Sequence, residues 1–145
     1  METTPTILDQ IRTHGAEAYP EEGCGFLLGV VTEDGTHRVT DTRPAPNRRA
    51  ERRERRYELT AEDYRAADAA AREQGLDVVG TYHSHPDHPA RPSETDLAEA
   101  TFPGFTYVIV SVQDGEPDTL TAWTLAPDRS AFTREEITVY PPETA

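Results

Sequence analysis

Lysine is absent from this chain of 145 residues, and all 14 basic residues are arginine. Against them stand 27 acidic residues, which give a formal net charge of −13 at pH 7. This charge opposes the neutralisation of phosphates on which general nucleic-acid binding depends. One account of this composition is a GC-rich genome, combined with a salty cytoplasm in which acidic surfaces stay soluble. A second account is functional, because a protein without lysine cannot accept a modifier on a lysine side chain.

Long apolar segments and paired cysteines are missing as well. The longest apolar runs, such as GFLLGVV, fall far short of the roughly 20 residues that a membrane-spanning helix needs. The N-terminal stretch lacks the basic start and apolar core of a secretory signal, so we expect a cytoplasmic protein without a membrane partner. The single Cys excludes an internal disulfide and fits a reducing compartment. The chain length predicts a single domain over residues 1–145.

Segments rich in β-branched and aromatic residues predict strands, and helical patterns lie between them. The predicted strands cover residues 21–31, 37–47, 76–85, 105–112, 119–125 and 132–140. Asp-Gly pairs separate the first of these strands from the second, and the fourth from the fifth, as is typical of hairpin turns. Such a mixture predicts an α/β or α+β domain with a mixed sheet.

Capping signals mark the helical segments. Residues 4–14 predict a first helix, which the stretch GAEAYP is expected to end. The strongest helical pattern begins after Thr60, which forms a predicted capping box with Asp63, and it ends at Gly75. Ser93 is expected to cap a short third helix.

Three of the five histidines fall within the stretch TYHSHPDHPARPSETD. If His83 and His85 continue the preceding strand, both side chains point to one face, about 7 Å apart along the backbone. Asp96 would then lie in the first turn of the helix that Ser93 caps, beside the end of that strand. Two His and a carboxylate with an open fourth position are typical of a catalytic zinc site. The remaining histidines are expected to be ordinary surface or core residues: His14, His37 and His88.

A hydrolase built on such a site also needs a base for the attacking water and a donor for the oxyanion. Glu21 and Glu22 precede an apolar strand. A carboxylate at the start of that strand could reach the metal-bound water. Ser93 could supply the donor. Plainer interpretations exist, because Ser93 with Asp96 fits an ordinary capping box and the two Glu residues fit solvated loop charges. The joint pattern favours a functional site.

The joint pattern resembles the JAMM, or MPN+, metallopeptidase family. The family signature is an upstream Glu, then His-x-His, seven residues, Ser, two residues and Asp, and the stretch from His83 to Asp96 matches this spacing without departure. The stretch EEGCGFLLG is similar to the family's Glu-x-Cys-Gly segment, a likeness that selects Glu22 over Glu21. The resemblance covers roughly residues 5 to 125.

The resemblance implies both a fold and a reaction. The fold is the α/β sandwich shared with cytidine deaminases, in which helices enclose a mixed sheet. The reaction is hydrolysis of the amide or isopeptide bond after the C-terminal Gly-Gly of a ubiquitin-like or sulfur-carrier protein. The implied roles are Zn²⁺ binding by His83, His85 and Asp96, general base and later proton donor for Glu22, and oxyanion stabilisation by Ser93.

Two alternatives stay open beside this reaction. One is a binding or assembly module that keeps the fold and the metal without turnover. The other is a hydrolase in which Cys24 is the nucleophile and a histidine its base. Against the second, Cys24 lies between glycines at the head of an apolar strand, where a free Cys usually packs as a small hydrophobe. Cytidine deaminase chemistry is disfavoured because the chain lacks a Cys-x-x-Cys pair. The sequence leaves a homodimer open.

The stretch RRAERRERRY, residues 48–57, holds six Arg and two Glu in an otherwise acidic chain. One interpretation of the cluster from Arg48 to Arg56 is a solvated loop with local Arg–Glu pairs. Another is a docking surface for an acidic carrier protein or for its free carboxylate. Nucleic acid ranks last as a partner, given the net charge.

Overall fold

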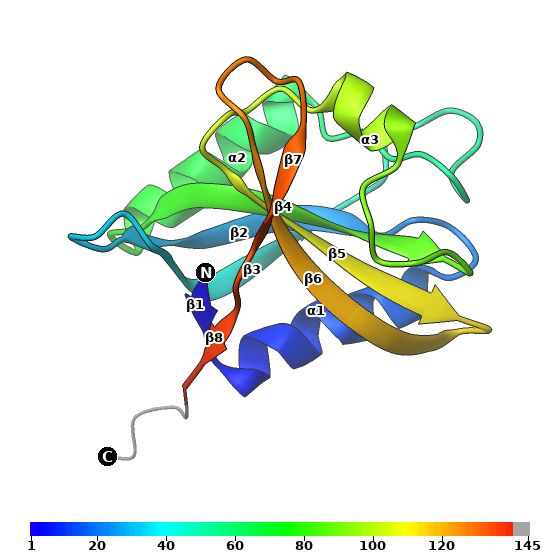
Figure 1. Cartoon of the computed structure of the whole chain (residues 1–145), viewed down its shortest axis with the longest axis horizontal. Coiled ribbons are helices and arrows are strands. Elements are labelled where there is room, and N and C mark those ends of the chain that lie inside the picture. The colour runs from blue at the N-terminus through cyan, green and yellow to red at the C-terminus, as the bar shows by residue number, and fades with distance from the viewer. Residues whose placement is uncertain (141–145) are drawn as a thin grey trace.

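The computed structural model describes residues 1–140, in which eight strands form one sheet and three helices lie against it (Figure 1). The strands are β1 (Glu2–Thr3), β2 (Cys24–Val31), β3 (His37–Ala45), β4 (Asp77–Pro86), β5 (Thr106–Gln113), β6 (Glu116–Leu125), β7 (Phe132–Glu135) and β8 (Thr138–Val139). The helices are α1 (Pro5–Ala18), α2 (Ala61–Glu73) and α3 (Glu94–Glu99). Across the sheet the strands follow the order β7-β6-β5-β4-β2-β3-β1-β8.

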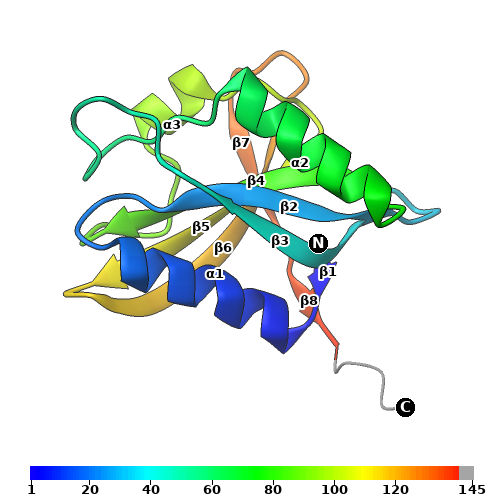
Figure 2. The same ribbon diagram turned by 180° about the vertical axis from the view of Figure 1, so that it is seen from behind.

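Helices α1 and α2 cover opposite faces of the sheet (Figures 1 and 2). Helix α1 contacts strands β3 to β6, and its buried side chains share a core with Leu27, Val79 and Val108. Helix α2 contacts β2 and β4, and Ala67 and Ala71 pack there against a second apolar cluster. The central pair β4–β5 is parallel while β2–β4 and β5–β6 are antiparallel. The predicted mixed sheet between helices is therefore confirmed. Within residues 1–140, no helix is long and apolar enough to cross a membrane.

The capping signals predicted where helices begin, but not where the first one ends. The capping box of Thr60 and Asp63 opens α2, and Thr4 caps α1, as expected. The prediction that the first helix stops near residue 14 is wrong, because α1 runs through Gly15 to Ala18. Gly15 is needed where α1 crosses the sheet: a Cβ there would meet the side chains of Ser84 and Val110 at 3.1 Å. Close packing, rather than helix termination, explains this glycine.

The last predicted strand, residues 132–140, is wrong as a single element. Its two halves pair at opposite edges of the sheet, β7 with β6 and β8 with β1. Glu135 ends β7 and accepts hydrogen bonds from the hydroxyls of Thr106 and Thr124, each at 2.9 Å. Ile137 then packs against the core that faces α1. The sheet thus curls far enough for a two-residue crossing to link its edges, which a local strand pattern does not reveal.

Two histidines outside the predicted site take part in packing, as expected of ordinary residues. His14 on α1 lies 2.6 Å from the hydroxyl of Tyr82, measured from Nδ1, and their rings meet edge to face. His37 Nδ1 lies 2.8 Å from the hydroxyl of Thr106. The contact of Tyr82 with α1 also fixes the orientation of β4, because neighbouring residues of a strand point to opposite faces. His83 and His85 therefore face away from α1.

Replacing Gly15 by Leu should destabilise the fold by about 1–3 kcal/mol, because the new side chain would have to displace β4 or β5. Urea denaturation followed by circular dichroism measures this change. The matched control is Thr13→Leu, at an exposed position of the same helix, which should keep the wild-type midpoint. Equal midpoints for both variants would contradict the close approach of α1 to the sheet.

Candidate metal centre

The two histidines of the His-Ser-His motif lie near the carboxyl end of β4, buried on the same face. Their Nε2 atoms are 3.1 Å apart, far closer than the backbone spacing of the strand. His85 is held through its other nitrogen, because Nδ1 lies 2.8 Å from the carbonyl oxygen of Pro89. A carbonyl only accepts hydrogen bonds, so Nδ1 carries a proton, and the neutral form of the ring therefore presents its lone pair at Nε2.

Asp96 reaches the same point from the first turn of α3. Its carboxylate oxygens lie 3.3 Å from Nε2 of His83 and 3.0 Å from Nε2 of His85. The same carboxylate accepts a hydrogen bond from the backbone N–H of Ser93, and the Ser93 hydroxyl accepts one from the backbone N–H of Asp96. The capping box and the site are therefore both present, and the cap orients the carboxylate. The three side chains present ligand atoms within 4.8 Å of one another.

The chemistry of these donors fits a metal cation. Two imidazole nitrogens and a carboxylate are electron-pair donors. Because they are grouped in one buried place, a single cation can bind all three. Burial lowers the pKa of His83, which favours the neutral ring that a metal requires. Burial alone would raise the pKa of Asp96, but the charges and hydrogen bonds of the two imidazoles hold it well below its usual range. The cluster of His83, His85 and Asp96 is thus suited to hold a metal ion.

Glu22 lies beside this cluster, just before β2. It is 4% exposed, and its Oε1 has no hydrogen-bond partner within residues 1–140. Burial raises the pKa of Glu22 to about 8, although His85 acts in the opposite direction. A carboxylate whose pKa is raised and whose oxygen is unpaired is suited to accept a proton. Glu21, by contrast, is exposed and pairs with Arg53 at 3.9 Å.

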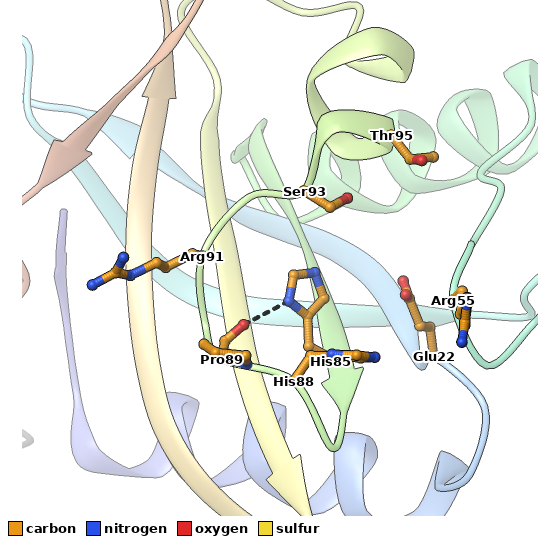
Figure 3. A pocket seen from close by; sticks show the side chains of 8 residues that line it. All are labelled: Glu22, Arg55, His85, His88, Pro89, Arg91, Ser93 and Thr95. Atoms are coloured by element: carbon orange, nitrogen blue, oxygen red, sulfur yellow. Dashed lines mark hydrogen bonds between the residues drawn. The ribbon is translucent and has the colours of Figure 1, made fainter.

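A pocket of about 410 Å³ opens onto the cluster (Figure 3). Figure 3 shows Glu22 and His85 on facing sides of it, with Ser93 and Thr95 on a third side, where α3 begins. The Ser93 hydroxyl oxygen already accepts from Asp96, so its own proton remains available to donate into the pocket. His88, which was expected to be an ordinary surface or core residue, also lines this space. The predicted base, the predicted oxyanion donor and one predicted ligand therefore share one cavity.

Cys24 is fully buried and plays no visible part in the site. Its sulfur contacts the carbonyl oxygen of Ala45 at 3.8 Å. Burial raises the pKa of the thiol to about 12, so the reactive thiolate is strongly disfavoured. Although Cys24 stands opposite His83 in the sheet register, no hydrogen bond joins their side chains within the described residues 1–140. The geometry does not support a Cys–His hydrolase.

Three further residues shape the site and were not predicted from the sequence. The Ser84 hydroxyl, between the two histidines, accepts from the backbone N–H of Gly23 at 2.8 Å and so fixes the segment that carries Glu22. Tyr57 stacks on His83, and Asn47 binds the backbone of Glu22. Tyr57 is the one aromatic residue of an Arg-rich stretch, which was a usable signal. The sequence holds no comparable signal for Asn47, because asparagines are common in loops.

Local ion pairs account for much of the arginine cluster. Four of its residues pair with acidic side chains, namely Arg48 with Asp63, Arg53 with Glu21, and both Arg49 and Arg56 with Glu99. These pairs agree with the plainer interpretation of a solvated, paired loop. Arg55, however, lines the pocket, on the side of Glu22 in Figure 3.

Known proteins are similar in sequence to this chain over most of its length. The desampylase of Haloferax volcanii is 39% identical over 106 residues, which cover 73% of this chain and 73% of that protein. The CysO-cysteine peptidase of Mycobacterium tuberculosis is 30% identical over 133 residues, 92% of this chain and 86% of that protein.

Solved structures share the fold. The solution structure of a protein from Salinibacter ruber is 75% identical, with a TM-score of 0.79 over 100% of this chain and 95% of that one. A JAB1/MPN domain protein from Archaeoglobus fulgidus, 22% identical, has the same fold with a TM-score of 0.61 over 96% of this chain and 98% of that one.

The family described as prokaryotic homologs of the JAB domain matches residues 4–126. This match confirms the resemblance drawn from the His-x-His, Ser and Asp spacing. The chain therefore belongs to the prokaryotic JAB-domain family.

Proposed function

We propose that this chain is a zinc-dependent peptidase that hydrolyses the amide bond after the C-terminal Gly-Gly of a ubiquitin-like or sulfur-carrier protein. One observation carries the proposal: His83, His85 and Asp96 converge beside the buried carboxylate of Glu22, whose Oε1 has no hydrogen-bond partner within residues 1–140. The names of two relatives, a desampylase and a CysO-cysteine peptidase, support this class of reaction and substrate.

Zinc is the metal that this ligand set favours. Two imidazoles and one carboxylate with room for a fourth ligand are typical of catalytic zinc sites, and no Cys joins the cluster in the described part of the chain. When bound, Zn²⁺ would supply Lewis-acid polarisation of the scissile carbonyl and would acidify water. Ser93 orients Asp96 through the capping box, and Pro89 orients His85. Such outer partners fix the direction in which ligand atoms point.

The chain's own residues account for the proton transfers. Glu22 takes a proton from the attacking water and later delivers it to the leaving amine. Its burial suits both steps, because a raised pKa makes the carboxylate a better base and its acid form a stable proton carrier. Ser93 donates a hydrogen bond from its hydroxyl to the oxyanion that forms at the carbonyl. All three events occur in the pocket of Figure 3.

A binding module without turnover is the alternative function. Such a module needs the fold and the ligands, but it has no use for a buried carboxylate without a partner. Burying Oε1 of Glu22 without a hydrogen-bond partner in the described part of the chain costs stability, since buried polar groups are normally hydrogen-bonded. This cost favours the peptidase over the module.

Glu22→Gln should lower the cleavage rate about 100-fold or more while the bound metal stays at the wild-type level, because only the proton acceptor is lost. Mass spectrometry of a Gly-Gly-extended carrier measures cleavage, and elemental analysis measures the metal. Glu21→Gln is the matched control and should cleave normally, since Glu21 is exposed. A Glu22→Gln enzyme that cleaves at the wild-type rate would falsify the base assignment.

Removal of metal should abolish cleavage, and added Zn²⁺ should restore it. The protein is dialysed against a strong chelator, assayed, and titrated with Zn²⁺ while cleavage and bound metal are followed together. Recovery should saturate at one equivalent of Zn²⁺, because the structure provides one cluster within residues 1–140. Full activity in protein that holds no metal would sink the proposal. In His85→Ala, neither binding nor recovery is expected.

Cys24→Ala should leave the cleavage rate unchanged, because the thiol is buried and held in its protonated form. The same carrier assay applies, with circular dichroism to confirm that the variant is folded. A folded Cys24→Ala protein that binds Zn²⁺ but no longer cleaves would instead revive the Cys–His alternative.

A further inference from the structure

The arginine loop, defined here as residues 47–58, touches every element that carries a site residue. It lies between β3 and α2, beside the segment that precedes β2 and beside α3 (Figures 1 and 2). The backbone N–H of Glu22 donates to the carbonyl of Arg53 at 2.7 Å. Arg49 and Arg56 both reach Glu99, the last residue of α3. The loop therefore contacts the elements of Glu22 and Asp96 at once.

Tyr57 holds the plane of one metal-binding histidine. Its ring stacks on that of His83 with centroids 4.3 Å apart and an angle of 21° between the planes. His83 differs from His85 in a second respect: its Nδ1 is buried and has no hydrogen-bond partner within residues 1–140. Metal-binding histidines usually donate that second N–H, which fixes the ring. In His83, the stacked tyrosine is the contact that takes over this task.

Asn47 fixes the position of Tyr57 relative to Glu22. Its amide nitrogen donates to the carbonyl oxygens of Glu22, at 3.1 Å, and Arg56, at 2.9 Å. Its amide oxygen accepts from the backbone N–H groups of Arg49, at 3.0 Å, and Glu58, at 3.1 Å. Arg56 and Glu58 flank Tyr57, so the Asn47 side chain forms hydrogen bonds with the backbone on both sides of the tyrosine. The same side chain forms a hydrogen bond with the backbone of Glu22, the residue expected to act as base.

The ion pairs of the loop are the weaker part of this arrangement. Arg49 and Arg56 approach Glu99 only to 3.6 and 3.9 Å, and both pairs are partly exposed. Exposed pairs of this kind contribute little to stability. Beside the backbone hydrogen bond from Glu22 to Arg53, the amide of Asn47 and the ring of Tyr57 are therefore the main contacts between the loop and the site.

We propose that Asn47 and Tyr57 are positioning residues of the metal centre: Tyr57 sets the ring plane of His83 by stacking, and Asn47 locks Tyr57 to the backbone of Glu22. The proposal deepens the proposed function, on which it rests for the role of Glu22. It assigns to the arginine loop a task in the assembly of the site, beside any role in docking a partner.

Tyr57→Leu should weaken Zn²⁺ binding about 10- to 100-fold, the usual effect of losing an outer partner of a metal ligand. Competition with a chromophoric chelator measures the affinity, and the visible spectrum of the Co²⁺-substituted protein reports the ligand geometry. Tyr57→Phe keeps the stacked ring and should restore both readouts. Tyr64→Leu is the control, because within residues 1–140 the ring of Tyr64 stacks on Phe102 and Phe105 and on no histidine of the cluster. It should lower the unfolding midpoint without changing the affinity.

Asn47→Asp keeps the accepting oxygen and removes the two donated hydrogen bonds. It should lower kcat and Zn²⁺ affinity each by about 10-fold or more, with KM unchanged, because positioning is lost rather than substrate binding. Its unfolding midpoint, measured in parallel, separates this effect from a general loss of structure. Wild-type affinity and kcat in folded Asn47→Asp, or wild-type affinity in folded Tyr57→Leu, would overturn the inference.

The affinity measurements also keep this inference distinct from the proposed function. If the wild-type protein binds Zn²⁺ but cleaves no Gly-Gly-extended carrier, the function fails while the effect of Tyr57→Leu on affinity still decides the role of the tyrosine. If the wild-type protein cleaves and Tyr57→Leu binds Zn²⁺ normally, the function stands and the positioning role fails.

Discussion

The antiparallel pairing of β2 with β4 is the constraint on which the rest of the site depends. Gly23 and Ser84 are 61 residues apart in sequence, yet they exchange two hydrogen bonds, one to the serine hydroxyl and one between backbones. This pairing places the segment of Glu22 directly beside His83 and His85. Because Tyr82 on the same strand points to α1, the two histidines face the opposite side, where α3 and the arginine loop lie. One strand thus builds the core on one face and a candidate metal centre on the other.

Folding and chemistry share the same hydrogen bonds around α3. A capping box ordinarily serves only to start a helix. Here its two members, Ser93 and Asp96, are also the predicted oxyanion donor and the third ligand of the cluster. A short helix of six residues would be marginal alone, so its cap and its contacts with the site stabilise each other. Removing the cap should therefore weaken the metal site, and removing the contacts with the site should destabilise α3.

Patterns local in sequence predicted much of the fold and the grouping of the site. The spacing, the joint pattern with Glu22 and Ser93, and the family resemblance together predicted that His83, His85 and Asp96 would meet, because a strand and a capped helix turn fix where side chains point. Long-range geometry was not predictable: the split at Glu136 and Ile137 depends on the curl of the whole sheet. The length of α1 was not predicted, because Gly15 is required by the close approach of α1 to the sheet, which exists only in the folded chain. Tyr57 stands out in sequence as the one aromatic residue of an Arg-rich stretch, but its contact with His83, like that of Asn47 with Glu22, forms only in the folded chain.

The curled sheet has a consequence for how the protein behaves when concentrated. Its outermost strands within the described residues are β7, four residues long, and β8, two residues long. Unpaired strand edges are templates on which further chains add, and short edges are one way in which proteins suppress such growth. A net charge of −13 adds mutual repulsion between copies. The shortness of the two outermost strands and the repulsion between copies therefore both oppose edge-to-edge addition at β7 and β8.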